Sequence, residues 1–189
     1  MIIQYMMLLT AGVSACFDLA IARIPNAVLF ASLAAGAVMR IGQAAGIPAA
    51  VLFPADADAG AASLIDGAAG MAVPVLLLAV FWHNRMIGAG DIKLLAVIGF
   101  YAGLRGVLWI TFWSFAAAAV ISAGILWANG NWAERFGYFL KYIRSAIRGE
   151  REAPYRTVAR GGALRPDCEM HFAVAVLMEI MMYAGGARP

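Results

Sequence analysis

Apolar runs long enough to cross a lipid bilayer recur along this chain, and they constrain its fold more than any other feature. Hydrophobic residues make up 63% of the 189 residues and charged residues only 13%, unlike the mixture found in a soluble domain. A spanning helix needs roughly 20 mainly apolar residues. Hydropathy and helix breakers predict an all-α, polytopic membrane protein with six transmembrane helices, at about 2–20, 26–41, 63–83, 91–104, 106–128 and 170–186.

The first apolar run has neither the basic start of a secretory signal peptide nor a convincing cleavage site, so we expect it to remain as a transmembrane helix. Cys16 and Cys168 form no CxxC pair, which argues against a zinc ribbon or a disulfide framework. His83 and His171 fall near the ends of predicted crossings and are typical of interface positions rather than of a metal site. The sequence predicts one membrane domain, 1–189, with no metal and no cofactor.

The stretch from 91 to 128 is either two short crossings divided at the LRG sequence (104–106) or one long tilted crossing. The distribution of positive charge favours two crossings. Six crossings gather most basic residues on one face, whereas five divide them between both faces. The positive-inside rule makes that face cytoplasmic, and it receives Arg23, Arg85, Lys93 and the basic residues of 129–169.

The segment 129–169 combines basic residues with apolar residues at helical spacing. We expect an amphipathic helix there that lies along the cytoplasmic membrane surface and is attracted to anionic lipid. The segment 42–62 has no lysine or arginine and is rich in Ala, Gly, Pro and Asp, which is typical of an irregular external loop. The apolar positions of the expected amphipathic helix are Trp132, Phe136, Phe139, Leu140, Ile143 and Ile147.

Two aspartates, Asp18 and Asp91, fall at the cytoplasmic ends of predicted crossings, and therefore at one depth. Charge within a membrane protein tends to face a cavity, a partner or water. Each aspartate also has a plain structural alternative, because Asp91 could cap its helix and Asp18 could pair with Arg23. Asp66, near an outer helix end, favours a structural role, and Glu179 lies deeper in the last crossing.

Two adjacent carboxylates would form a useful acid–base pair, because like charges a few ångströms apart do not both ionise easily and so share a proton. The ionised carboxylate can take a proton from water as the water attacks a peptide carbonyl. The protonated one can donate a hydrogen bond to the carbonyl oxygen, where negative charge develops. Gly88 and Gly90 beside Asp91 permit a close approach of backbone that a Cβ would block.

The stretches FDLAIARIPN (17–26) and GAGDIKLLA (88–96) resemble the two signatures of the prepilin peptidases, or type IV leader peptidases, which are polytopic aspartic proteases of the GxGD type. The resemblance implies that Asp18 and Asp91 are catalytic. It further implies hydrolysis of a basic leader from prepilins or pilin-like precursors at the cytoplasmic face of the bacterial inner membrane. Pro25 and Asn26 start the second helix and are architectural. The supporting residues that match the signatures are Arg23, Ile24, Pro25, Asn26, Gly88, Gly90 and Lys93.

Larger relatives carry an extra cytoplasmic domain with paired cysteines that N-methylates the new pilin terminus. This chain has no CxxC, so it resembles the peptidase-only forms that serve tight-adherence (Flp) pili, and no N-methyltransferase domain is expected. The expected partners are prepilin-type precursors and anionic lipid, with no nucleic acid.

Two other classes of protein fit the intramembrane acids. In a membrane carrier or channel, the two aspartates would bind a proton or cation within a polar pathway. In an inert assembly factor of a pilus or secretion system, they would only hold helices together. Substitution of aspartate by asparagine separates these classes from a protease.

Overall fold

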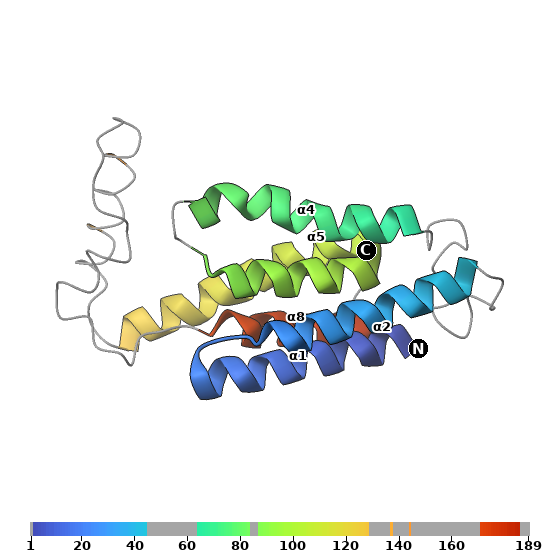
Figure 1. Cartoon of the computed structure of the whole chain (residues 1–189). Helices are drawn as coiled ribbons and strands as arrows, with labels where there is room; N and C mark the ends of the chain where they lie inside the picture. Colours follow the sequence, from blue (N-terminus) through green and yellow to red (C-terminus); the bar gives the residue numbers. More distant parts are fainter. Residues whose placement is uncertain are drawn as a thin grey trace.

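A computed structural model describes residues 2–44, 64–83, 87–128 and 171–185, with single helical positions at 137 and 144. The secondary structure of these ranges is α-helical, and the helices lie side by side as a bundle (Figure 1). Within these described ranges, three segments are long and apolar enough to cross a membrane, Ile2–Ile21, Leu64–His83 and Ala89–Ile125, while two further apolar helices are shorter. The helices are α1 (Ile2–Ile21), α2 (Asn26–Ala44), α4 (Leu64–His83), α5 (Ala89–Ala128) and α8 (Phe172–Ala184).

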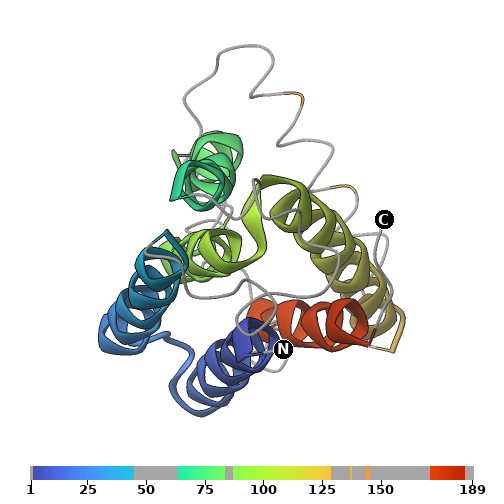
Figure 2. The ribbon, with the colours of Figure 1, turned by 90° about the vertical axis from the view of Figure 1, so that its right-hand side faces the viewer.

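A sharp turn at Gly103 divides α5 into two arms, 89–102 and 104–128. Gly103 has φ 75° and ψ −179°, a conformation that essentially only glycine adopts. The chain turns back at this point, and the second arm returns toward the end of the bundle where α5 begins (Figures 1 and 2). The predicted break is therefore confirmed, one residue before the LRG sequence, and the single tilted helix is wrong.

The predicted helix positions hold, but several ends differ. α2 continues to Ala44, which corrects the start of the expected external loop, and α5 begins at Ala89 instead of 91. α8 has 13 residues, which corresponds to about 20 Å and is shorter than the predicted 170–186. The count of six crossings stays a prediction. The rest of the loop before α4 and almost all of 129–169, with its expected amphipathic helix, lie outside the described residues.

Polar groups from α2 and α4 hold the two arms of α5 at the turn. The buried Arg40 donates hydrogen bonds from Nε to the Phe100 carbonyl oxygen at 2.9 Å and from Nη2 to the Tyr101 carbonyl oxygen at 3.2 Å. Asp66 Oδ1 accepts a hydrogen bond from the Leu104 amide at 3.1 Å. The Asp66 carboxylate also acts electrostatically on Arg40. Two of the carbonyls at the end of the first arm and one amide at the start of the second thereby gain partners, and Asp66 takes the structural role that its position predicted.

The first arm of α5 forms the centre of the bundle, with Leu94, Leu95 and Ile98 fully buried. Small residues let other helices approach it closely, as is common between membrane helices. A Cβ on Gly70 of α4 would collide with the carbonyl oxygen of Gly99, so here two helix backbones touch directly. The first arm is therefore a rigid support for the residues at its beginning.

One end of the bundle gathers five chain segments: the end of α1, the start of α2, the end of α4, and the starts of α5 and α8 (Figure 1, left). The rings of Phe115 and Phe172 lie 4.9 Å apart and anchor the start of α8 against the second arm of α5. Both sequence signatures fall at this end.

Candidate functional site

The first signature forms the last turn of α1 and the short connection to α2. The Ala22 amide donates to the Asp18 carbonyl oxygen at 2.9 Å, and Ala22 has a positive φ of 50° where the helix ends. The Pro25 carbonyl oxygen accepts from the Val28 amide at 3.2 Å as α2 begins at Asn26. The prediction that Pro25 and Asn26 start the second helix is confirmed, and the connection fixes how α1 ends beside Asp18.

The second signature forms the start of α5. Asp91 stands in the first turn of the helix, where a negative charge is favourable. A Cβ on Gly88 would lie 3.0 Å from Asp91 Oδ2, so the carboxylate lies close against this glycine. Because α5 begins at Ala89, Asp91 lies inside the first turn and not at the capping position itself.

The two signatures touch each other. Lys93 Nζ donates a hydrogen bond to Asn26 Oδ1 at 3.0 Å. The Ile24 side chain packs against Gly90, with its Cβ 3.6 Å from the place that a glycine Cβ would occupy. The connection that follows Asp18 is therefore seated on the helix start that carries Asp91.

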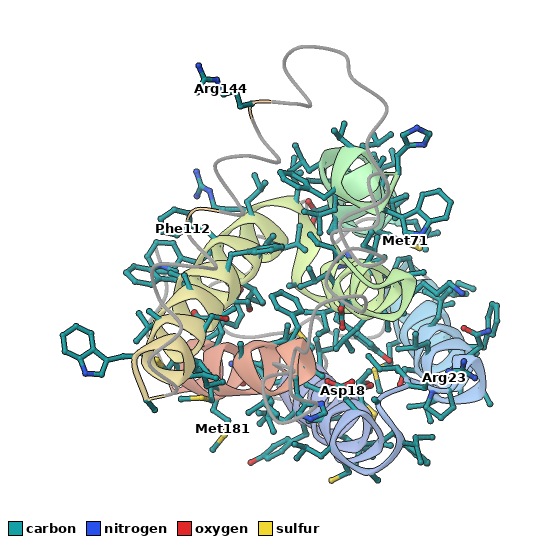
Figure 3. All side chains as sticks on the ribbon, turned by 90° about the vertical axis from the view of Figure 1, so that its left-hand side faces the viewer. Asp18, Arg23, Met71, Phe112, Arg144 and Met181 are labelled. Atoms are coloured by element: carbon teal, nitrogen blue, oxygen red, sulfur yellow. The ribbon has the colours of Figure 1, made fainter. Side chains whose placement is uncertain are left out.

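The ionisable partner of Asp18 comes from an unexpected segment. His171 Nδ1 lies 3.4 Å from Asp18 Oδ2, with 30% and 14% of the two side chains exposed. The alternative in which Asp18 pairs with Arg23 is wrong, because Arg23 is exposed and lies farther out beside α2, whereas Asp18 lies where α1 meets α8 (Figure 3).

Sequence reasoning missed His171, which it treated as an interface position. The signal that could have identified His171 was its predicted depth in the membrane. It immediately precedes the last apolar run, and so it belongs to the same membrane face as Asp18. Glu179 does not belong to this end. It is buried in α8, eight residues and therefore about 12 Å along the helix from His171. Within the described ranges, no three His, Cys, Asp or Glu residues are placed to hold a metal ion.

Apolar helices of spanning length define a helical membrane protein with two acid-bearing signatures in contact at one end. The family model of the type IV leader peptidases matches residues 3–123, which is more than half of the chain. The chain belongs to the type IV leader peptidase family, whose members are peptidases of prepilin-type substrates. The match includes both signatures and ends before α8. No curated protein and no solved structure matches the chain at a significant level.

Proposed function

We propose that this protein is a prepilin leader peptidase, an aspartic endopeptidase that removes the basic leader from prepilins or pilin-like precursors at the cytoplasmic face of the bacterial inner membrane. The observation that carries the proposal is the contact between the two signatures, through Lys93 with Asn26 and Ile24 with Gly90. These contacts join the chain next to Asp18 to the chain next to Asp91. These contacts therefore lie beside both members of the proposed catalytic pair, Asp18 and Asp91.

In the proposed reaction, one aspartate is ionised and the other is protonated. The ionised carboxylate takes a proton from water as the water oxygen bonds to the carbonyl carbon of the leader's last peptide. The protonated carboxyl donates a hydrogen bond to the carbonyl oxygen as charge develops there. The C–N bond then breaks, and the departing amine takes the proton from the carboxyl that received it. No covalent enzyme intermediate is needed.

The supporting residues fix this geometry. Ile24 lies against the start of α5 at Gly90, where an added Cβ would be 3.6 Å from the Ile24 Cβ; this is an ordinary contact, so the expectation that a Cβ at Gly90 would block the approach is wrong. Pro25 and Asn26 set the direction in which α2 leaves the site. The exposed Lys93 joins α5 to α2 at the same end.

The two rival functions remain useful for designing the test. A carrier would need the aspartates for transport and an assembly factor would need them for helix packing, whereas a peptidase needs them for cleavage alone. Family membership favours the peptidase.

The test is co-expression of the enzyme with candidate pilin precursors. Wild type is compared with Asp18→Asn and Asp91→Asn, with leader loss followed by mass spectrometry and enzyme abundance by immunoblot. Glu179→Gln is the matched control, because it makes the corresponding change from carboxyl to amide at a buried position of α8, away from the end of the bundle that carries both signatures.

We expect Asp18→Asn and Asp91→Asn to accumulate normally and to leave the precursor uncut, while Glu179→Gln cleaves it. Normal processing by either of the first two variants would refute the aspartate pair. Loss of the protein itself in both variants would point to the assembly role.

A further inference from the structure

We propose that His171 is a positioning residue that holds Asp18 by a hydrogen bond and makes it the ionised member of the pair, the general base. This inference rests on the proposed peptidase function and deepens it, because two adjacent carboxylates alone leave open which one is the base. Asp91 then supplies the protonated carboxyl.

In the contact between His171 and Asp18, the histidine is the hydrogen-bond donor. An ionised carboxylate only accepts hydrogen bonds, while an imidazole nitrogen that carries a proton donates one. His171 Nδ1 lies 3.4 Å from Asp18 Oδ2, so with a proton on Nδ1 the imidazole would be the donor and the carboxylate the acceptor. Such a bond is strongest when the carboxylate is charged. A separation of 3.4 Å is long for this bond, but catalytic hydrogen bonds are often long until substrate binds.

The backbone that carries the His171 imidazole is held in place by packing. His171 immediately precedes α8, whose residues Ala173, Ala175 and Val176 are fully buried. The ring of Phe172, the next residue, lies 4.9 Å from that of Phe115 in the second arm of α5. The backbone of His171 therefore has little freedom to move, and its ring can hold one orientation of the Asp18 side chain.

The two aspartates have different surroundings. Asp18 stands at the end of α1 and meets a nitrogen donor from α8. Asp91 stands in the first turn of α5, with its carboxylate against Gly88. Different surroundings are what assign the roles of acid and base to two like groups. The family match ends at residue 123, so His171 lies outside the matched stretch.

The test uses two substitutions of nearly equal shape, His171→Asn and His171→Leu. The asparagine amide places a donor near the position of Nδ1, whereas leucine offers none. His83→Leu is the matched control, because His83 is an exposed histidine at the same end of the bundle. The purified full-length enzymes are assayed for kcat and KM on a precursor that the wild type cleaves, and their melting temperatures are compared.

We expect His171→Leu to lower kcat about 10- to 100-fold with KM within about twofold, since misplacing a reacting group by about 1 Å has effects of this size. His171→Asn should recover most of the loss, and His83→Leu should behave as wild type. Equal kcat in His171→Leu and wild type would overturn the inference. So would equal losses in the Leu and Asn variants, or a loss confined to KM.

Asp18→Asn and Asp91→Asn, assayed in parallel, separate the two proposals. If both are inactive while His171→Leu is fully active, the peptidase function stands and the role of His171 falls. If either aspartate variant cleaves normally, the proposed function falls, whatever the histidine variants do.

Discussion

Replacing Gly103 by alanine should open the turn inside α5 and destabilise the bundle. Two separate terms contribute. The backbone conformation at Gly103, with φ 75° and ψ −179°, is open essentially only to glycine, and forcing another residue into such a region costs about 1–3 kcal/mol. A Cβ at this position would also collide with the Asp66 carboxylate.

The second term follows from that collision. Asp66 Oδ1 must then leave the Leu104 amide, which it accepts at 3.1 Å, and a hydrogen bond to a charged group contributes about 1.5–3 kcal/mol. The combined loss is about 2.5–6 kcal/mol. For a chain of this size it lowers Tm by at least about 5 °C, because each kcal/mol corresponds to roughly 2–4 °C.

The assay is thermal unfolding of the purified protein in detergent, with Gly124→Ala as the matched control. Gly124 lies in the second arm of the same helix, and its added Cβ would meet nothing within 4 Å. Alanine there should be neutral or stabilising by up to about 1 kcal/mol. In an Asp66→Ala background, Gly103→Ala should lose only the backbone term. Equal melting temperatures for Gly103→Ala and Gly124→Ala would refute the reasoning.

Three further predictions concern the packing around α5. Arg40→Met should destabilise the protein by about 3–5 kcal/mol, because it leaves Asp66 without its buried partner charge, and adding Asp66→Asn should recover part of the loss in the same unfolding assay. Gly70→Ala should destabilise by about 1–3 kcal/mol or more, because the opposing atom is a backbone oxygen of Gly99 that no side-chain motion can move; an unchanged Tm would contradict the close contact. Lys93→Ala removes an exposed hydrogen bond to Asn26 and should change the free energy of unfolding by less than about 1 kcal/mol; a larger loss in chemical denaturation would show that this bond holds the site together.

The positions of the helices could be predicted because hydropathy and helix breakers act locally. The break within α5 was foreseen at the LRG sequence from charge placement, since two crossings put the basic residues on one face. Its exact residue and its cause were not. The turn is held by Arg40 from α2 and Asp66 from α4. The sequence of 89–128 by itself does not indicate that these two residues contact it.

The candidate site could be predicted as far as its two signatures reach. Asp18 and Asp91 stand out because carboxylates at one membrane depth are rare in so apolar a chain, and the structure brings their neighbours Ile24 and Gly90 together. His171 could not be paired with Asp18 from the sequence, because that contact depends on how α8 packs against α1 and on where α8 begins.

The turn at Gly103 also bears on how the protein is inserted into the membrane during synthesis. The segment Ala89–Ile125 leaves the ribosome as one apolar stretch of 37 residues, which on its own favours a single long helix. Arg40 and Asp66 both precede it in the chain, so the groups that hold the turn are already made when Gly103 emerges. The second arm can fold back as soon as it is synthesised. The order of the helices along the chain thus suits the order in which the bundle must close.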